Sequence, residues 1–454
     1  MTQPPAVSAE RGARLVRVGV LGCGNVGGEL VELVDANAAA IAARSGIRLE
    51  IVKVAVRNLA KPRAGTLVPG RLTHDAHAVA TADDVDVVVE LIGGIEPART
   101  LIVHALRAGK PVVTGNKELV ANFGAELYAV AEAAGRELLV EAAVGGAIPI
   151  VRALRVSLAG ERIRRVTGIV NGTTNYVLSR MSEERIGYGD ALREAQSLGY
   201  AERDPTADVE GYDASAKAAI LASIAFNADV VAGDVYREGI ERIEVADIDV
   251  AHRLGYEVKL LAVAERVGDG DAIGVRVHPA MVPKGHPLAG VRGPFNAVFV
   301  EGEAAGELML YGRGAGGAPT ASAVLGDLID ASRNLRAGAH APAPRRRQTT
   351  VRGNDELRSA FYISLDVVDR PGVLASVAAA FGSHAVSIRA MEQDGLGTEA
   401  RLFFLTHVAR EGDVRATLDA LAAIDTVVRV GAVLRVVGAD DAPARGAHAP
   451  VRSR

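Results

Sequence analysis

The chain has 454 residues, more than a single typical domain contains, so we expect two or three domains. Hydrophobic residues make up 49% and charged residues 23%, which is typical of a globular protein with a large core. The formal net charge of −4 gives no reason to expect a nucleic acid or a membrane surface as partner. Because Cys23 is the single cysteine, an intrachain disulfide and a thiolate metal cage are excluded, and we expect a reducing compartment, the cytoplasm.

Short valine-rich runs alternate with alanine-rich helical segments from about Arg14 to Glu141. The runs RLVRVGVLG, LEIVKVAVR, VDVVVELIG, KPVVTG and RELLVEA have the apolar character of buried parallel strands. The segments between them are long enough for crossover helices. The pattern therefore predicts a doubly wound α/β domain.

A glycine motif follows the first predicted strand, in the stretch VLGCGNVGGEL. It has the form G-x-G-x-x-G between a strand and a helix, the context in which such a loop binds the pyrophosphate of a dinucleotide. The candidate cofactor-binding residues of this loop are Gly22, Gly24, Asn25, Val26 and Gly27. We predict a Rossmann-type NAD(P)-binding domain over residues 14–143, with a plain glycine turn as the alternative.

The second predicted strand ends at a basic residue, Arg57, in KVAVRNLAKPR. An NAD site usually offers an acid to the ribose 2′-hydroxyl at this place, whereas an arginine suits a 2′-phosphate. Lys61 and Arg63 follow, and the stretch contains no acid. We predict NADP as the cofactor. Use of NAD stays open, and a basic exposed loop is the alternative.

Polar groups also follow two later strands. Lys117 stands in TGNKEL, where a charged side chain at the carboxyl end of a strand can reach a cofactor or substrate. Asn171, Thr173 and Thr174 stand in GIVNGTTNYVLSRM, a polar loop before a predicted helix. These groups can contact a polar substrate, or they cap the helix and no more.

A glycine turn in VEAAVGGAIPI lies next to one carboxylate, Glu141. Such a turn exposes carbonyl oxygens, and together with Glu141 it offers the all-oxygen ligands that a hard monovalent cation prefers. A purely structural turn is the alternative.

Five carboxylates crowd into LGYAERDPTADVEGYDASAK, which ends at Lys217. Asp213 and Lys217 lie four residues apart, on one face of a predicted helix. Since nearby opposite charges favour the charged form of a lysine, we expect a protonated Lys217 that can donate a proton. The acids, Glu202 and Asp208 among them, can bind a cationic group such as the α-ammonium of an amino acid. A solvated acidic loop with one salt bridge is the alternative.

The remaining chain divides by pattern into three parts. Residues 144–336 mix amphipathic segments with runs typical of antiparallel strands, which predicts an α+β domain. Residues 337–357, rich in Ala, Pro and Arg, predict a linker. Residues 358–438 have their own strand-helix-strand-strand-helix-strand pattern, and residues 439–454 predict a disordered tail.

The chain resembles the homoserine dehydrogenases that lack an aspartokinase domain and carry a C-terminal ACT domain. The matching motifs are GCGNVGGEL, TGNKEL, EAAVGGAIPI, GIVNGTTNYVL, LGYAERDPTADVEGYDASAK and YGRGAGGAPTASAV, in the order of the family and over about residues 14–335. DRPGVLA, from Asp369 to Ala375, is similar to the ligand loop of an ACT domain. One departure is Asn25, where family members often carry threonine or another small residue.

The resemblance implies a reversible reaction on the route to threonine and methionine: L-aspartate 4-semialdehyde and NAD(P)H give L-homoserine and NAD(P)+. It makes Lys217 the proton donor to the aldehyde oxygen. The acids Glu202, Asp208 and Asp213 would bind the substrate amino group or orient the lysine. Lys117 would lie near both the nicotinamide and the substrate.

The resemblance also implies further binding sites and a separate role for each domain. Residues 144–336 become the substrate-binding, catalytic and dimerisation domain, whose final helix returns to the nucleotide-binding domain. Gly316 corresponds to a glycine beside the cofactor. A sodium site would be formed by Glu141 with the backbones of Val144, Gly146 and Ile148.

The ACT domain implies regulation and a homo-oligomer, a dimer or a tetramer. Its predicted sheet has helices on one face only, so we expect it to pair with a copy of itself. The pathway suggests L-threonine as the effector, and a dimerisation module without a ligand is the alternative. Because the catalytic motifs lie upstream, we expect a chain cut after about Leu357 to keep its activity.

Two other classes of protein compete with this interpretation. The first is another ACT-bearing dehydrogenase, acting on a hydroxy acid or on prephenate, which would need a catalytic histidine in a motif that this chain does not show. The second is a non-enzymatic amino-acid sensor that keeps a nucleotide-binding fold, which would not need Lys217 together with its acids.

Overall fold

The computed structural model describes residues 13–61, 69–268, 270–340, 349–395, 397 and 399–438. The chain forms two compact units. The first comprises Met1–Gly172, Asp213–Val235 and Phe295–Thr350, and the second comprises Thr173–Tyr212, Tyr236–Pro294 and Val351–Arg454. Because the boundary cuts through two helices, these units differ from the three predicted domains, whose boundaries stay predictions. Within the described ranges, every helix is too short or too polar to cross a membrane.

A six-stranded parallel sheet forms the N-terminal half of the first unit, with the order β3-β2-β1-β4-β5-β6. This is the strand order of a Rossmann fold, in which ligands bind at the switch point, here between β1 and β4. The strands are β1 (Arg14–Leu21), β2 (Ile47–Ala55), β3 (Leu72–Thr73), β4 (Val87–Glu90), β5 (Val112–Thr114) and β6 (Leu138–Leu139).

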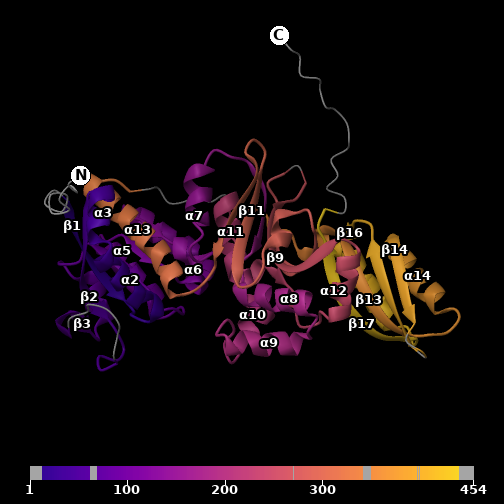
Figure 1. Cartoon of the computed structure of the whole chain (residues 1–454). Coiled ribbons are helices and arrows are strands. Elements are labelled where there is room, and N and C mark those ends of the chain that lie inside the picture. Colours follow the sequence, from indigo (N-terminus) through magenta and orange to yellow (C-terminus); the bar gives the residue numbers. More distant parts are fainter. Residues whose placement is uncertain are drawn as a thin grey trace, which may run out of the picture. The chain divides into compact units, whose positions relative to one another are not determined.

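Helices follow these strands as the alternating pattern predicts (Figure 1). They are α2 (Asn25–Ala36), α3 (Ala38–Ser45), α4 (Ala76–Thr81), α5 (Ala98–Arg107) and α6 (Lys117–Ala133), with a short turn η1 (Pro69–Arg71) before β3. A much later helix, α13 (Gly317–Ala337), packs against α2. The N-terminal domain is therefore completed by a segment from far along the chain.

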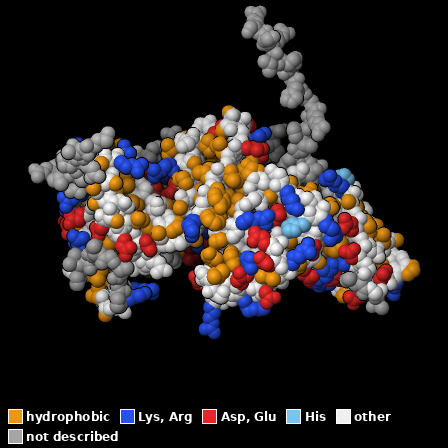
Figure 2. Space-filling model, viewed as in Figure 1, with side chains coloured by type: hydrophobic (Ala, Val, Ile, Leu, Met, Phe, Trp, Pro, Cys, Tyr) orange, Lys and Arg blue, Asp and Glu red, His pale blue; other side chains and the backbone are white. Residues whose placement is uncertain are grey.

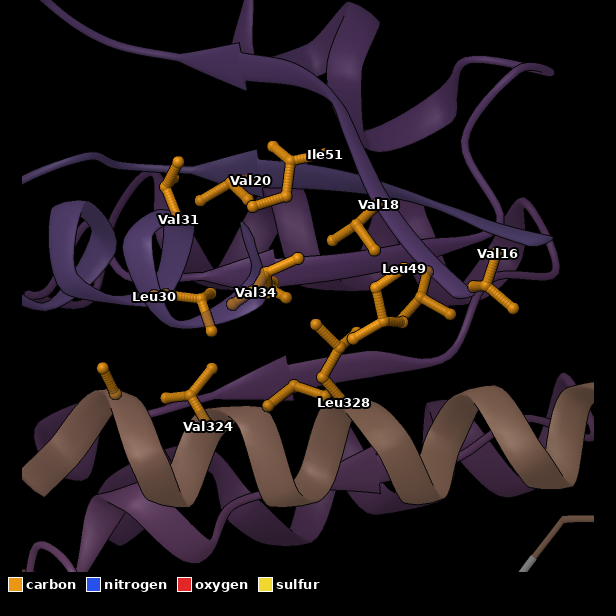
Figure 3. Close-up of a cluster of buried hydrophobic side chains, with 14 of the residues drawn as sticks. Val16, Val18, Val20, Leu30, Val31, Val34, Leu49, Ile51, Val324 and Leu328 are labelled. Carbon is orange, nitrogen blue, oxygen red and sulfur yellow. The ribbon is translucent and has the colours of Figure 1, made fainter. Parts of the chain in front are cut away.

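The core between the sheet and α13 is aliphatic. Val18 and Val20 of β1 and Leu30 of α2 are fully buried, and Val324 and Leu328 of α13 point at them (Figure 3). The buried residues of α13 recur at the spacing of one helix face, which explains why this helix covers apolar surface. Each such side chain contributes roughly 1.5–3 kcal/mol when it is buried.

The first unit contains a second, antiparallel group of strands, in which β11 (Phe295–Gly302) pairs with β7 (Ile163–Ile169) and with β12 (Gly306–Arg313). Most residues of the long helix α11 (Tyr212–Phe226) are buried. The connecting turns are η2 (Glu141–Ala143), α7 (Ile150–Arg152), η3 (Ala153–Ser157) and η4 (Ala232–Asp234).

The second unit combines helices with a long antiparallel pair, β9 (Tyr256–Arg266) and β10 (Ile273–Pro283). Its helices before the C-terminal region are α8 (Gly172–Glu184), α9 (Tyr188–Ser197), α10 (Thr206–Val209) and α12 (Val245–Arg253). Two short elements, β8 (Tyr236–Arg237) and η5 (Pro287–Gly290), complete this part, and β8 pairs with β10.

The C-terminal region has the predicted βαββαβ order and a sheet of order β17-β13-β15-β14. Its elements are η6 (Asn354–Glu356), β13 (Arg358–Val368), α14 (Val373–Ser383), β14 (Ile388–Gly395), β15 (Glu399–Thr406), β16 (Ala409–Arg410), α15 (Glu411–Ala422) and β17 (Val427–Val436). Phe361, Ile363 and Leu365 of β13 belong to a core shared with α14 and α15. The edge strand β17 also pairs in parallel with β10, through Ala280 with Arg435.

The other face of this sheet is covered in part by α12 of the same chain (Figure 1). The fully buried Tyr362 donates a hydrogen bond from its hydroxyl to Asp247 Oδ1 at 2.8 Å. Arg401 and Arg429 pair with Glu244, which precedes α12. The second face of the sheet is therefore not fully uncovered, because an upstream helix that the strand pattern does not reveal packs on part of it. Pairing with a copy of the chain stays a prediction.

Charges of both signs are interspersed on the face of the molecule that Figure 2 shows. The exposed arginines and lysines there alternate with acids, in line with the small net charge. Three sequence-based expectations concern residues outside the described ranges: Arg63, the middle of the predicted linker (341–348) and the tail (439–454).

Candidate functional site

The glycine loop after β1 has the geometry that a dinucleotide site needs. Gly22 adopts a left-handed φ of 94°, and a Cβ there would lie 2.6 Å from the carbonyl oxygen of Leu91. A Cβ on Gly27 would lie 2.6 Å from the carbonyl oxygen of Gly22, so this position has no room for a side chain. At Gly24 nothing lies within 4 Å. The open space at Gly24, directly before α2, is where a pyrophosphate would approach the helix N-terminus.

Other predicted cofactor residues lie around this loop. Asn25 and Val26 open α2, and the amide of Gly22 donates to the carbonyl of Ala55 at 2.9 Å, which ties the loop to the end of β2. Arg57 is exposed two residues after that end. Gly316 precedes α13 with a φ of 118°.

Gly317 brings the start of α13 close to α2. A Cβ on Gly317 would lie 3.0 Å from Cγ of Glu29 and 3.6 Å from the carbonyl oxygen of Asn25. The start of α13 and the start of α2 therefore approach each other, which places the neighbouring Gly316 beside the dinucleotide loop.

A cluster of charges lies at the start of α11, at the centre of the first unit. Lys217 Nζ donates to Asp213 Oδ2 at 2.7 Å and to the carbonyl oxygen of Val170 at 2.8 Å. Asn171 Nδ2 donates to the same Asp213 oxygen at 2.8 Å. Lys117 Nζ donates to Asp213 Oδ1, so one carboxylate contacts both lysines. The predicted pair of Asp213 and Lys217 is thus present, and Lys117 joins it from the start of α6.

Burial and charge both act on Asp213. Its side chain and that of Lys217 are 6% and 9% exposed. Burial alone would raise the pKa of the Asp213 carboxyl, but the charges of Lys217 and Lys117 and their hydrogen bonds outweigh it and hold the pKa well below its usual range. Asp213 is therefore a carboxylate at neutral pH, and it favours the charged form of the lysines that it contacts.

The two lysines differ in their access to solvent. The side chain of Lys117 is 47% exposed, whereas that of Lys217 is 9% exposed. Asn116 fixes the start of α6, because its Oδ1 accepts from the amide of Leu119 at 3.1 Å and its Nδ2 donates to the carbonyl of Gly94 at 2.6 Å. The cluster thus offers one buried ammonium and one half-exposed ammonium.

The other two predicted substrate acids lie in the second unit. Asp208 belongs to α10 and is half-buried, and Glu202 is exposed in the preceding loop. Their assignment to the substrate stays a prediction. Thr173 lies in the first turn of α8, and its hydroxyl donates to the carbonyl of Tyr200 at 2.6 Å.

The predicted cation turn has two left-handed glycines, Gly145 with a φ of 76° and Gly146 with a φ of 58°. Within the described ranges, no backbone amide donates to the carbonyl oxygens of Val144 or Gly146. Glu141 is 5% exposed, and its two carboxylate oxygens accept from the amides of the first turn of α7, at 2.8 and 2.7 Å. Carboxylate and carbonyl oxygens are ligands that a hard cation prefers, but both oxygens of Glu141 are engaged with α7, and the cation site stays a prediction.

A buried acid next to Glu141 went unnoticed in the sequence. Asp327 of α13 accepts from the amide of Glu141 at 2.8 Å, and Arg152 approaches its other oxygen at 3.4 Å. Burial raises the pKa of Asp327 to about 7, and it also raises the pKa of Glu141 above its usual range. The sequence signal for this buried acid was an aspartate among the mostly apolar residues of one helix face.

A second buried acid that we did not predict from the sequence lies at the end of β4. Glu90 is fully buried and accepts from the amide of Ile92 at 2.7 Å and from the hydroxyl of Thr114 at 2.6 Å. It therefore joins the carboxyl ends of β4 and β5 beside the switch point of the sheet. A glutamate that ends an all-valine run was the signal for it.

Family models match three stretches of the chain: the NAD-binding domain of homoserine dehydrogenase over residues 22–141, homoserine dehydrogenase over 149–329 and an ACT domain over 361–426. A curated homoserine dehydrogenase from Mycobacterium tuberculosis is 49% identical over 434 residues, which cover 93% of this chain and 98% of that protein. The chain belongs to the homoserine dehydrogenase family. As a member of that family it is an oxidoreductase with a nicotinamide cofactor, a catalytic domain and a C-terminal ACT domain.

Solved structures of the homoserine dehydrogenase family agree with this fold. A homoserine dehydrogenase from Thiobacillus denitrificans superposes with a TM-score of 0.87 at 40% identity, over 94% of this chain and 99% of that one. A hyperthermophilic archaeal homoserine dehydrogenase in complex with NADPH superposes with a TM-score of 0.58 at 27% identity, over 70% of this chain and 98% of that one. The expected family and fold class are confirmed.

Proposed function

We propose that the chain reduces L-aspartate 4-semialdehyde reversibly to L-homoserine, with Lys217 as the proton donor. The observation that carries the proposal is the cluster of Lys217, Asp213 and Lys117 in the same unit as the dinucleotide loop. A bound NADPH supplies the hydride that reaches the aldehyde carbon. The chain must then neutralise the charge that develops on the aldehyde oxygen.

The proton comes from an ammonium that the fold holds in place. An ammonium group has three protons. The hydrogen bonds of Lys217 to Asp213 and to the carbonyl of Val170 use two of them, which leaves the third for the aldehyde oxygen. In the reverse direction the neutral amine would take the proton of the homoserine hydroxyl.

The remaining acids and the second lysine would bind the amino acid. We assign the substrate ammonium to Glu202 and Asp208, which lie within fifteen residues of Lys217 along the chain. Lys117 is the more exposed ammonium of the cluster and would contact the substrate carboxylate or the aldehyde oxygen. Its bond to Asp213 would orient it for either contact.

We assign NADP as the preferred cofactor. Arg57 is exposed just beyond the end of β2, where the 2′-phosphate of NADP lies in Rossmann folds. The archaeal relative whose structure is a complex with NADPH supports this choice. Use of NAD remains compatible with the same loop.

We also assign a sodium site to Glu141 with the backbones of Val144, Gly146 and Ile148. Among the described residues, no group of three histidine, cysteine, aspartate or glutamate side chains converges on a metal position, so carbonyl oxygens would have to supply most ligands. The carbonyls of Val144 and Gly146, to which no described backbone amide donates, support that arrangement, whereas the carbonyl of Ile148 accepts from the amide of Ile150 at 2.8 Å. A bound ion would fix the turn between the two halves of the first unit.

For the ACT domain we propose feedback control by L-threonine, bound beside the loop of Asp369 to Gly372, in a homo-oligomer. The loop is exposed, and Gly372 adopts a left-handed φ of 92° before α14. The activity would then serve threonine and methionine synthesis. Threonine would favour a less active arrangement, with a coupling of about 1–3 kcal/mol.

One assay separates this function from its competitors. Purified enzyme should oxidise NADPH when L-aspartate 4-semialdehyde is added and should reduce NADP+ when L-homoserine is added. Activity with a 2-hydroxy acid or prephenate, and none with homoserine, would indicate another dehydrogenase. Binding of amino acids with no redox activity at all would indicate a sensor.

A further inference from the structure

A cavity of about 430 Å³ lies within the second unit, where the C-terminal domain meets β8 and the segment after it. Its volume falls within the roughly 300–1,000 Å³ of small-molecule sites. One wall comes from β17 and α15, another from residues 236–243, and a third from Glu210 directly after α10. The loop at Asp369 does not line it, so this cavity is separate from the proposed threonine loop.

Charges of both signs line the cavity, and most of them are paired. Arg435 is 4% exposed and donates to Glu411 Oε2 at 2.6 Å and to Glu238. Arg415 donates to Asp355 Oδ1 at 2.6 Å. These pairs build the wall and leave little charge of their own for a ligand.

Three further charged residues of the wall are not engaged. Within the described part of the chain, the side chains of Glu210, Glu241 and Arg242 form no hydrogen bond or ion pair, and Glu241 acts on Tyr188 through its charge alone. Asn354 Oδ1 is a buried acceptor in the same wall, and it too has no partner among the described residues. Buried acceptors of this kind are usually satisfied by a donor, so the cavity lacks one.

We propose that this cavity binds a basic α-amino acid. Two ammonium groups would pair with Glu210 and Glu241, and the carboxylate would pair with Arg242. The apolar side chains of Val414 and Leu418 in the wall suit the methylene stem. The two acids and the arginine of the cavity match a small molecule that carries two cations and one anion. A neutral amino acid carries only one of each.

A ligand here would also reach the segment that carries the substrate acid Asp208; this part rests on the proposed function. The amide of Ile240 donates to the carbonyl of Val209 in α10 at 2.9 Å. Gly239 has no space to move toward α10, because a Cβ there would lie 2.4 Å from the same carbonyl oxygen. A shift of the wall on binding would therefore displace α10 and change the affinity for the amino-acid substrate.

Calorimetric titration of the full-length chain, without substrate or cofactor, tests the binding. L-lysine should bind at one site per chain. L-norleucine has the same carbon skeleton without the side-chain ammonium, and cadaverine has both ammonium groups without the carboxylate. Each should bind at least about tenfold more weakly, since each lacks one charge-assisted contact. Absence of saturable binding at about 10 mM L-lysine, or equal binding of norleucine, would overturn the proposal.

Two variants locate the site. Glu241→Gln and Arg242→Gln change exposed side chains of the cavity mouth and should each weaken L-lysine binding by about tenfold. Asp419→Asn, an exposed acid of α15 outside the cavity wall, is the matched control and should leave binding unchanged. Lysine binding that survives both cavity variants would place the ligand elsewhere and refute this assignment.

Kinetic measurements test whether ligand binding in the cavity displaces α10. L-lysine should change the KM for L-homoserine by about fivefold or more, with little change in the KM for NADP+. Binding without any such change would overturn the connection. An enzyme that binds L-lysine but does not oxidise homoserine would leave the cavity assignment intact and refute the proposed reaction, so the two failures are distinguishable.

Discussion

Asp213 determines the charge of the site, because a single buried carboxylate contacts two lysines. Asn171 donates to it as well, so one of its oxygens has two donors. The low pKa of this carboxyl keeps it ionised at neutral pH. In our proposal Asp213 keeps Lys217 protonated and orients its ammonium toward the aldehyde oxygen. Asp213 is therefore a positioning residue as well as a substrate ligand.

Replacing Lys217 with alanine should lower turnover by roughly 10²–10⁴-fold, the usual contribution of a positioned general acid. The dinucleotide loop does not involve this side chain, so NADPH should still bind. Steady-state rates together with a fluorescence titration of NADPH measure both effects. Lys284→Ala, at an exposed lysine, is the control. Near-normal turnover of the Lys217→Ala enzyme would contradict the assignment.

Arg57→Ala should raise the KM for NADPH and leave that for NADH nearly unchanged. A charge-assisted contact to the 2′-phosphate contributes roughly 1.5–3 kcal/mol, which corresponds to about tenfold or more in KM. Arg48, exposed at the other end of β2, provides the matched control as Arg48→Ala. Equal effects of Arg57→Ala on both cofactors would show that Arg57 does not contact the phosphate.

Asp327 should make the stability of the first unit depend on pH. Its pKa is about 7 in the folded chain, above the ordinary value of 3.8. Between these two pH values the carboxyl is therefore protonated in the folded state and ionised in the unfolded state. The free energy of unfolding should therefore fall as pH rises from about 4 to about 7, by at most about 4 kcal/mol from this group.

Asp327→Asn removes the titrating group and keeps an oxygen for the amide of Glu141. Denaturant unfolding at a series of pH values should give a flatter profile for this variant than for the parent chain. Asp330→Asn, three residues along the same helix and more exposed, is the control. Parallel profiles for the parent chain and Asp327→Asn would refute the assigned pKa.

At the scale of elements, the strand-to-helix turn β1–α2 allows three glycines to be tested separately. Gly27→Ala should destabilise the fold and weaken cofactor binding, because its Cβ would collide with the carbonyl of Gly22. Gly24→Ala meets no protein atom, so it should leave stability unchanged and raise the KM for NADPH. Thermal unfolding and cofactor titration distinguish these effects.

Gly28→Ala is the control, since its Cβ also meets nothing and lies one residue further into the helix. It should be neutral or slightly stabilising, as alanine is favoured over glycine in a helix by roughly 0.5–1 kcal/mol. Loss of stability in Gly24→Ala would show that this glycine serves the backbone and not the cofactor.

Local patterns predicted the elements well and their tertiary partners poorly. The helical spacing of Asp213 and Lys217 was enough to pair them, because residues four apart share a helix face. Lys117 joins them across 96 positions of the chain, and Asp327 reaches Glu141 across 186. No local signal encodes such pairs. Likewise, the strand pattern predicted the C-terminal sheet, but the helix α12 that covers its second face comes from far upstream.

At the scale of the whole molecule, the C-terminal domain is not independent of the chain before it. Deletion of the residues after Leu357 removes β17 from β10, Tyr362 from Asp247 and Glu411 from Arg276, which keeps only its ion pair with Glu265. The loss of these hydrogen bonds and of the ion pair lowers stability, and an exposed strand edge favours aggregation. Contrary to our expectation from the sequence, this physical argument predicts that the truncated chain loses stability.

The shortened chain should therefore melt at a lower temperature than the full chain and aggregate in light scattering. A chain that lacks only the residues after Gly438 is the control and should behave like the full protein. Regulation by threonine is then better tested with Asp369→Ala, comparing inhibition curves that are each normalised to the uninhibited rate. A soluble, fully active enzyme after the long deletion would contradict the structural argument.

The hydrogen-bonded join between β10 and β17 also limits how this enzyme can be recombined with its relatives. A regulatory domain grafted from another family member would have to present the same register at Ala280 and a tyrosine and an arginine at the places of Tyr362 and Arg435. Chimeras that exchange the domain at residue 357 alone should fail. Those that also exchange β8, α12 and β10 carry both sides of these contacts and should fold, with the effector specificity of the donor.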